Sequence, residues 1–368
     1  MSNSRSAWTP TRRATLAGLG AFGASGVVRA QDAPSLAVAA RRAGRLYGAA
    51  AEPGPLETDR DFADLFRRQC AVLTAENALK WNALRPSIDS YDFIDADRLV
   101  DFVRRNGLRM HGHGLVWHEA LPAWFAGAVD AANARRLLGE HIRTVVGRYA
   151  GVIGSWDVVN EAVERNDRRA DGLRRSPWLE LAGPDYLDFA FHTAHEADPS
   201  ALLTLSDYGL EYDDIAWMVE KRGTVLELLA GMKARGVPIH ALALQGHLDG
   251  ARPPAFGAGL ADFLRRVAAL GLRIFITELD VSDQTLAGAV AERDAAVAGV
   301  YRAFLRTVLA EPAVRMVVTW GLSDRYTSQA SFRPRADGAP VRPLPFDRAL
   351  APKPAAAAML RAFEAAAI

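Results

Sequence analysis

Short apolar runs recur along the chain, and segments with helical spacing separate them. One such segment carries Phe62, Leu65 and Phe66, whose spacing of three and four residues places them on one face of a helix. Runs that are nearly continuous in apolar residues are typical of parallel strands, which are buried on both faces beneath helices. The sequence therefore predicts eight alternating strand and helix units, with strands at residues 46–51, 71–75, 109–117, 155–160, 202–205, 240–244, 273–277 and 314–320.

Eight such units favour a closed (β/α)8 barrel, the TIM barrel of the α/β class, over an open doubly wound sheet. A doubly wound sheet usually has a Gly-rich phosphate loop after its first strand, but residues 49–52 read AAAE. No Pro/Ser/Gly-rich linker interrupts the chain after residue 31. We therefore expect residues 31–368 to form a single domain, with long loops that extend it beyond the roughly 250 residues of a common barrel.

The first thirty residues have a different character. Residues 11–13 (TRR) precede an apolar, Ala/Gly-rich stretch at 14–28, and the small-residue pattern VRA closes it at 28–30. The stretch is too short to span a bilayer and has no polar face, while paired arginines are typical of twin-arginine export signals. We expect residues 1–30 to be a signal peptide that directs export to the periplasm or the outside of the cell, with no membrane attachment after cleavage.

The net charge of the chain bears on the kind of molecule that it binds. The 368 residues include 44 basic and 43 acidic residues, so a formal net charge of +1 supplies no long-range attraction for nucleic acid or an anionic membrane. A neutral partner fits better, and we expect a monomer.

Cys70 is the only cysteine, so the chain has no intramolecular disulfide, and its position indicates a buried structural thiol.

Polar residues end nearly every apolar run. In a parallel barrel these positions gather at one mouth, where the active site is built. Helix capping could explain one or two such positions, but not seven. The polar residues are Glu76, Asn77 and Lys80 after the second run; His111, His113, Trp117 and His118 in the third; Asn160 and Glu161; Asp207 and Tyr208; Gln245 and His247; Glu278 and Asp280; and Trp320 with Asp324.

These residue types suit a sugar. The apolar faces of pyranose rings stack on indoles such as Trp117 and Trp320. The ring hydroxyls need hydrogen-bonding partners, and several polar side chains of the set can supply them. Candidate partners are Glu76, Asn77, Lys80, Gln245 and His247.

Glu161 and Glu278, on the fourth and seventh predicted strands, could flank a glycosidic bond across the barrel mouth. One carboxyl must protonate the leaving oxygen while the other, ionised, attacks the anomeric carbon. An ionised Glu278 favours the protonated form of Glu161, and its conversion to an ester favours the ionised form. Glu161 could therefore act first as an acid and then as a base.

Several motifs, taken together and in order, resemble glycoside hydrolase family 10, whose members are chiefly endo-xylanases. The similarity runs from about residue 46 to 346, which is nearly the whole predicted mature chain. The motifs that carry it are TAENALKW at 74–81, HGLVWH at 113–118, WDVVNE at 156–161, QGH at 245–247 and ITELD at 276–280.

The resemblance implies a (β/α)8 endo-1,4-β-xylanase that hydrolyses xylan or xylo-oligosaccharides with retention, through a covalent glycosyl-enzyme intermediate, and without a metal or cofactor. It implies that Glu161 is the acid/base and Glu278 the nucleophile. The resemblance also implies that Asn160 contacts the sugar 2-hydroxyl, that His113 and Trp117 contact the reacting ring, and that Glu76, Asn77 and Lys80 contact the next ring. His247 and Asp280 would orient Glu278. Tyr208 and Gln245 would line the groove, and Trp320 would be a stacking surface.

The chain departs from the family pattern away from the two glutamates. Ala120 stands where Gln is usual, and Ser328 replaces a tryptophan eight residues after Trp320. Ser206 and Gly209 stand where Asn is common. These changes affect the expected affinity and subsite preference rather than the reaction type, because a lost stacking ring costs about 1 kcal/mol.

Two other functions have some support in the sequence. His111, His113, His247 and Asp324 suggest a metal-dependent amidohydrolase. That class carries its His-x-His pair on the first strand, whereas here the pair lies on the third, and the remaining ligand set is incomplete. Ala120 and Ser328 suggest a carbohydrate-binding relic without turnover. Retention of both glutamates and their expected partners argues against a relic.

Overall fold

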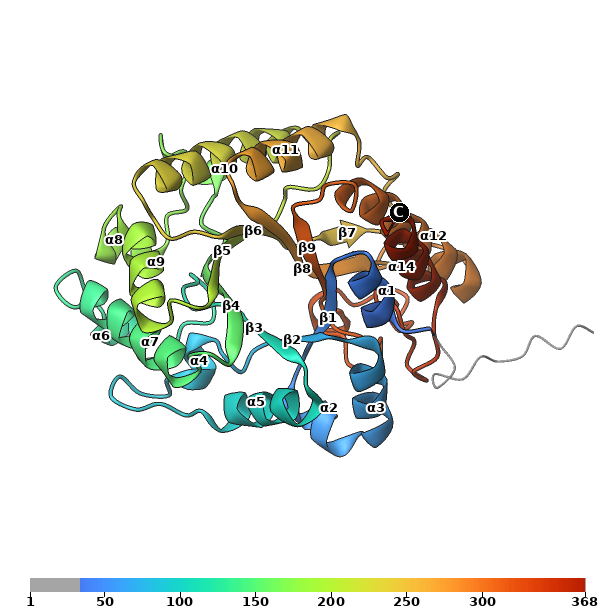
Figure 1. The fold of residues 1–368 in the computed structure, drawn as a ribbon, viewed down its shortest axis with the longest axis horizontal. Helices are drawn as coiled ribbons and strands as arrows, with labels where there is room; N and C mark the ends of the chain where they lie inside the picture. The colour runs from blue at the N-terminus through green and yellow to red at the C-terminus, as the bar shows by residue number, and fades with distance from the viewer. Residues whose placement is uncertain (1–33, 368) are drawn as a thin grey trace, which may run out of the picture.

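The computed structural model describes residues 34–367, in which eight parallel strands close into a barrel (Figure 1). The first strand pairs with both the second and the last, which completes the ring. The predicted (β/α)8 barrel is therefore confirmed, whereas the expected signal peptide at 1–30 lies outside the described residues. The barrel strands are β1 (Leu46–Ala51), β2 (Val72–Ala75), β3 (Arg109–Gly112), β4 (Ile153–Asn160), β5 (Leu202–Asp207), β6 (Ala241–Leu244), β8 (Arg273–Ser282) and β9 (Val314–Thr319).

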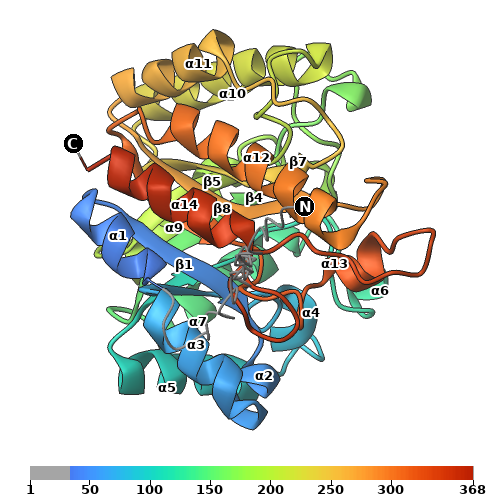
Figure 2. The same ribbon diagram turned by 90° about the vertical axis from the view of Figure 1, so that its right-hand side faces the viewer.

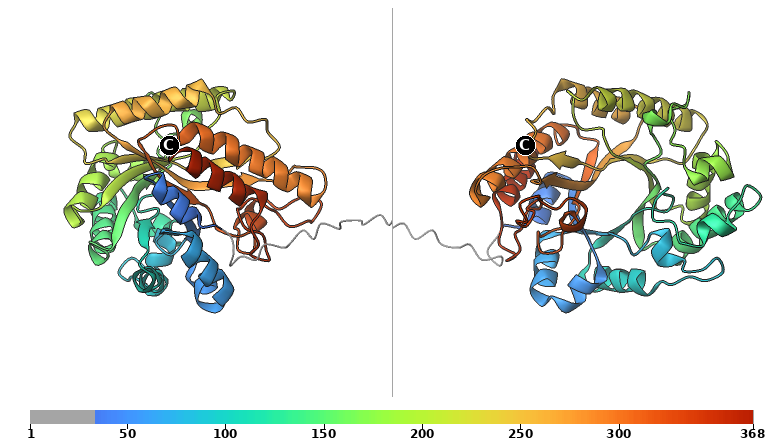
Figure 3. Two further views of the ribbon diagram at one scale, coloured as in Figure 1. Left: turned by 45° about the vertical axis from the view of Figure 1, so that its right-hand side comes forward. Right: turned by 180° about the vertical axis from the view of Figure 1, so that it is seen from behind.

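Helices surround the strands on the outside, and the views from both sides show the same ring (Figures 1 and 3). Within the described part of the chain, no helix has both the length and the hydropathy that a bilayer-spanning segment requires. The longer helices are α3 (Arg60–Gln69), α5 (Ile94–Asn106), α7 (Ala134–Arg148), α9 (Tyr186–Ala197), α10 (Ala216–Ala234), α11 (Ala258–Ala269), α12 (Val290–Val308) and α14 (Pro354–Ala365).

Shorter helices complete the outer layer. The ends of the described chain meet there, because α1 packs against α14, which also packs against α12 (Figure 2). The short helices are α1 (Leu36–Arg42), α2 (Pro53–Thr58), α4 (Trp81–Leu84), α6 (Phe125–Ala128), α8 (Pro177–Ala182), α13 (Gln329–Phe332) and the 3-10 turn η2 (Arg165–Asp167).

Local sequence signals explain where helices begin and end. Asp59 caps α3 by accepting a hydrogen bond from the Phe62 backbone N–H, and the predicted apolar face of this helix is buried. Gly107 ends α5 in the left-handed conformation that glycine adopts without a steric penalty. Cys70, which follows α3, is buried as expected.

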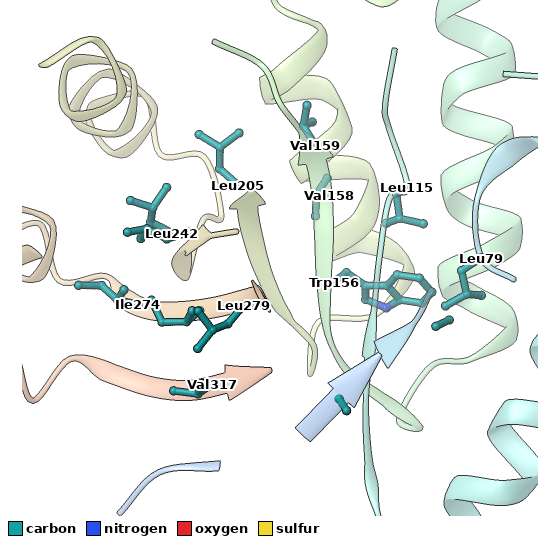
Figure 4. Close-up of a cluster of buried hydrophobic side chains, with 14 of the residues drawn as sticks. Leu79, Leu115, Trp156, Val158, Val159, Leu205, Leu242, Ile274, Leu279 and Val317 are labelled. Carbon is teal, nitrogen blue, oxygen red and sulfur yellow. The ribbon is translucent and has the colours of Figure 1, made fainter. Parts of the chain in front are cut away.

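Two apolar layers hold the barrel together. The larger one lies between strands and helices, and its members include Leu115, Trp156, Leu205 and Leu279 (Figure 4). A smaller cluster fills the barrel interior near the start of the strands, so the barrel is packed there rather than open. This inner cluster consists of Val72, Ala241, Ala243, Phe275, Met316 and Val318.

Above the inner cluster, the barrel interior becomes polar around one fully buried carboxylate, Asp157. His111 and His113 contact its Oδ2 at 3.1 and 2.9 Å, and the Thr204 hydroxyl donates to its Oδ1. Burial opposes the charged form, but the two imidazoles and these hydrogen bonds hold the pKa of Asp157 well below its usual range. An anchored negative charge therefore lies directly beneath the barrel mouth.

Two predicted strands end five residues away from the observed limits, the other predicted limits are met to within two residues, and the structure adds one strand. The run at 109–117 forms a continuous strand only as far as Gly112, because the backbone turns at Gly114, where φ is 82°. The chain then pairs with β4 again through a single bridge between Val116 and Val159. In contrast, β8 continues five residues beyond the predicted end at 277, to Ser282. The extra length pairs with β7 (His247–Asp249), a short strand outside the barrel ring that the apolar pattern did not predict.

The close fit between β3 and β4 can be tested at Gly112. A Cβ added there would lie 2.1 Å from the buried Trp156 ring, so Gly112→Ala should lower the free energy of unfolding by about 2 kcal/mol. Gly154→Ala, on β4, is the matched control because a Cβ there meets nothing within 4 Å. Urea unfolding of both variants measures the difference, and equal stabilities would contradict the proposed overpacking.

Candidate active site

A cavity of about 640 Å³ opens at the C-terminal ends of the strands. The structure brings every predicted site residue to its lining, although the segments that carry them are far apart in the sequence. These residues are Glu76, Asn77, Lys80, His113, Trp117, Asn160, Glu161, Tyr208, Gln245, His247, Glu278, Asp280 and Trp320.

Glu161 follows the last residue of β4 in an unusual backbone conformation. Its φ is 59°, in the left-handed region that non-glycine residues rarely adopt. The β4–β5 register shifts between Asp157 and Val159, and such a bulge can redirect a side chain. Backbone hydrogen bonds fix the result, because the Glu161 N–H donates to Ser206 and the Arg174 guanidinium donates to the Glu161 carbonyl. The carboxyl is thereby held in the cavity.

Both carboxyl oxygens of Glu161 accept hydrogen bonds. The Trp117 indole donates to Oε2 at 2.9 Å, and the Gln245 amide donates to Oε1 at 3.0 Å. Gln245 also contacts Asn160 Oδ1 at 3.2 Å, so a single amide links the two residues at the end of β4. These neutral donors orient the carboxyl without supplying a full positive charge.

Glu278 has a more strongly charged neighbourhood on β8. His247 Nε2 lies 3.1 Å from Glu278 Oε2, and its Nδ1 lies 3.0 Å from Asp280 Oδ1. Burial disfavours a charged imidazole, but the Asp280 and Glu278 carboxylates outweigh it and raise the pKa of His247 well above its ordinary value. A cationic His247 thus bridges two carboxylates. The β7–β8 pairing sets this geometry, since it places His247 opposite Asp280.

The second carboxyl oxygen of Glu278 has no such partner. Its Oε1 is buried but accepts no hydrogen bond from any residue between 34 and 367. His113 Nδ1, at 3.8 Å, is too distant for one. Because Glu278 lines the cavity, this oxygen keeps lone pairs available for a bound molecule.

The residues after β2 form a connected polar wall. Lys80 donates to Asn77 Oδ1 at 3.0 Å, and Asn77 in turn donates to Glu52 Oε1. The Lys80 ammonium lies 5.0 Å from the ring centroid of Trp117 and 5.8 Å from that of Trp320. Both predicted stacking residues thus face one cation at the cavity wall.

Tyr208 lies on another wall of the cavity, after β5. Its hydroxyl donates to Glu164 at 2.9 Å and accepts from Arg174 at 3.0 Å. Burial raises the pKa of Tyr208 to about 12, so the phenol remains neutral and able to donate.

The two unusual positions have different surroundings. Ser328 lines the cavity and hydrogen-bonds Glu76, so a hydroxyl occupies part of the space where the family pattern has an indole. Ala120 is absent from the lining, and its carbonyl accepts a hydrogen bond from the Asn82 backbone.

Two aromatic residues of the cavity lining were missed by sequence reasoning. Phe332, on α13, is 83% exposed, and Trp217, on α10, is 46% exposed. The Trp217 ring fits against Gly209, where an added Cβ would lie 2.4 Å from it. Neither residue follows a strand, so no strand-end signal marked them. The one sequence signal for Trp217 was Gly209, which departs from the family pattern and leaves room for the indole ring.

The surroundings of His111 do not suit the metal ligand that an amidohydrolase would require. Its Nδ1 lies 2.7 Å from the Ser155 hydroxyl, and its Nε2 contacts Asp157. Both ring nitrogens are thus engaged inside the barrel.

Comparison with known proteins identifies the family. The model of glycosyl hydrolase family 10 matches residues 35–362. The chain belongs to this family. The resemblance in the motifs is therefore confirmed, and the protein is a glycoside hydrolase.

Individual relatives agree with this assignment. A β-1,4-xylanase of Dictyoglomus thermophilum is 42% identical over 222 residues, a match that spans 60% of each chain. A thermostable celloxylanase of Thermoclostridium stercorarium is 35% identical over 89% of this chain and 87% of its own length. Xylanase 10B from Thermotoga petrophila RKU-1, solved in complex with xylobiose, has a TM-score of 0.80 at 31% identity, covering 91% of this chain and 98% of that one.

The electrostatics of the cavity predict a pH-dependent stability. Burial, together with the nearby Glu52 carboxylate, raises the pKa of Glu76 from 4.5 to about 7. The folded state then keeps a proton that the unfolded chain releases, so this group favours folding below about pH 4.5 and loses that effect as the pH rises through 7. As the pH rises from 4.5 to above 7, the free energy of unfolding should therefore fall. Glu76→Gln should remove up to about 3 kcal/mol of this fall.

Urea unfolding of the wild type and Glu76→Gln at pH 5 and pH 8 measures this effect. The variant should lose less stability between the two pH values than the wild type does. The same loss in both proteins would show that Glu76 titrates normally in the folded state.

Proposed function

We propose that this protein is an endo-1,4-β-xylanase that cleaves internal bonds of xylan and xylo-oligosaccharides with retention of configuration. The observation that carries the proposal is the unequal environment of two carboxyls in one cavity. Neutral donors hold both oxygens of Glu161, whereas Glu278 contacts a cationic His247 and keeps one oxygen free. The named activities of the relatives support xylan as the substrate class.

In the first half-reaction, Glu278 Oε1 attacks the anomeric carbon as the bond to the leaving oxygen breaks. Glu161 gives its proton to that oxygen, which releases one part of the chain and leaves the other as an ester on Glu278. In the second, Glu161 takes a proton from water as the water oxygen displaces Glu278 from the same carbon. Two inversions give net retention, and both carboxyls return to their starting states.

The His247 bridge explains why the two glutamates take different roles. A cationic imidazole 3.1 Å from Glu278 Oε2 attracts and orients the carboxylate that is to attack. Asp280 keeps that imidazole charged and fixed in orientation. Within residues 34–367 the hydrogen-bond donors to the Glu161 carboxyl are the neutral Trp117 and Gln245, and we assign the proton transfer to this carboxyl.

Aromatic surfaces complete the proposed sugar site. Trp117 and Trp320 lie around the reacting centre, where Lys80 faces both rings. Phe332 lies on the same short helix as Gln329, beside Ser328, while Trp217 lies against Gly209 on the Tyr208 side of the cavity. We infer that Phe332 supplies a stacking surface in place of the tryptophan that the family pattern has at position 328, where this chain has Ser328.

Export remains a prediction as well. The paired arginines at 12–13 and the apolar stretch after them support cleavage near residue 30. The mass of the protein recovered from the periplasm or medium of a producing cell would identify the first residue, which we expect to be Gln31. A mass that includes residues 1–30 would contradict the proposal. A monomer and the absence of nucleic-acid binding likewise stay predictions.

Release of reducing ends from soluble β-1,4-xylan tests the function. The wild type should release them, and Glu278→Ala should lower kcat to background because the ester cannot form. Glu161→Ala should lose about 10²- to 10⁴-fold on xylan, but less on an aryl xyloside whose leaving group needs no proton. Glu364→Gln, an exposed change on α14, is the control.

Two outcomes would contradict this function. If folded wild-type protein bound xylan without releasing reducing ends, it would be a carbohydrate-binding relic. If Glu278→Ala kept wild-type kcat, the nucleophile would lie elsewhere.

Phe332→Ala tests the proposed stacking surface. Because ring stacking contributes about 0.5–1.5 kcal/mol, the KM for xylo-oligosaccharides should rise about two- to tenfold with kcat nearly unchanged. Phe332→Tyr keeps a ring and should keep the wild-type KM. A KM unaffected by Phe332→Ala would show that the exposed ring does not contact the substrate.

A further inference from the structure

A second cavity, of about 680 Å³, opens where the barrel strands begin, at the end opposite the candidate active site. We call this cavity the N-terminal mouth. Its floor is the inner apolar cluster, including Val72, Phe275 and Met316, which separates it from the polar interior around Asp157. The N-terminal mouth is therefore a distinct site rather than an extension of the active-site cleft.

The charged residues around the N-terminal mouth all have the same sign. Among the described residues, five arginines line it and no Asp or Glu does. The whole chain has 44 basic and 43 acidic residues, so a basic composition does not explain this bias. The five arginines are Arg41, Arg45, Arg109, Arg273 and Arg315.

The active-site cavity has the opposite character. Within the described chain, its lining contains three cations, Lys80, Arg333 and the cationic His247, against six carboxyl groups. The barrel therefore presents an acidic face at one end and a cationic face at the other. The acidic lining residues are Glu76, Glu119, Glu161, Glu211, Glu278 and Asp280.

Stabilisation of helix ends accounts for two of the arginines. Arg41 lies in the last turn of α1, where a cation offsets the partial negative charge of the helix terminus. Arg45 donates to the carbonyls of Ala43 and Leu309, which follow α1 and α12. Its Nε is buried without an acceptor among residues 34–367, and burial together with Arg315 lowers its pKa.

The three arginines carried by strands have no comparable structural role. Arg109 and Arg273 are the first residues of β3 and β8. Arg315 is the extra residue of a bulge in β9, because Val314 pairs with Ile274 and Met316 with Phe275. All three are exposed, and within the described chain none of their guanidinium groups has a hydrogen bond or an ion pair.

We propose that the N-terminal mouth binds a small multivalent oxyanion of the phosphate or polyphosphate class. A guanidinium presents a planar fork of donors that matches two oxygens of such an ion, which a lysine ammonium cannot do. Arginines on β3 and on the β8–β9 pair reach the mouth from separate positions around the ring. The volume of the cavity accommodates more than one anionic group, which favours an oligophosphate over a single phosphate.

Calorimetric titration of the purified full chain with sodium phosphate and with tripolyphosphate, at constant ionic strength, tests this proposal. Tripolyphosphate should bind more tightly than phosphate. Arg109→Gln and Arg315→Gln should each weaken binding about fivefold or more, since each removes charge-assisted hydrogen bonds. These variants lose no internal contact, so they should fold normally by circular dichroism.

Arg302→Gln is the matched control, because Arg302 is exposed on α12, outside the mouth, and has no ion pair within the described chain. It should bind like the wild type. Absence of binding by the wild type, or equal weakening in the control, would overturn the proposal. Xylan hydrolysis by Arg109→Gln should equal that of the wild type, so the titration is independent of the proposed catalytic function.

Discussion

Closure of eight parallel strands is the constraint on which the rest of the structure depends. Because β1 pairs with both β2 and β9, every strand must end at the same mouth, and side chains from distant segments converge there. Register shifts occur in β4 before Glu161 and in β8 between Ile276 and Leu279, around Glu278. The barrel thus gathers the functional groups, and local irregularities in two of its strands accompany the two glutamates.

The same closure separates charge along the barrel axis. Asp157 anchors a buried negative charge under the active-site mouth, and His247 places a positive one beside Glu278. Two carboxyls of the same type can therefore take opposite roles in one cavity, because their partners differ rather than their chemistry. At the far end, an apolar layer isolates the cationic mouth from this arrangement.

The sequence was sufficient for the barrel and for the residues at strand ends, because apolar runs and the polar residues that close them are local signals. It could not predict β7, since three residues carry no periodicity of their own, yet that strand aligns His247 with Asp280. Trp217 and Phe332 were missed because they lie on helices rather than at strand ends, so the strand-end pattern did not mark them. The N-terminal mouth was missed for a related reason: its arginines are scattered from Arg41 to Arg315, and only the closed ring brings them together.

The central claim is that Glu278 forms a covalent bond to the sugar while Glu161 moves the proton. A 2-deoxy-2-fluoro xylobioside with an activated leaving group tests it directly, because the fluorine slows both half-reactions while the leaving group keeps the first one fast enough for the ester to accumulate. Intact mass spectrometry should show the addition of one fluorinated xylobiosyl group, and peptide mapping should locate it on Glu278. An enzyme that hydrolyses xylan but forms no adduct, or carries the adduct on Glu161, would contradict the account.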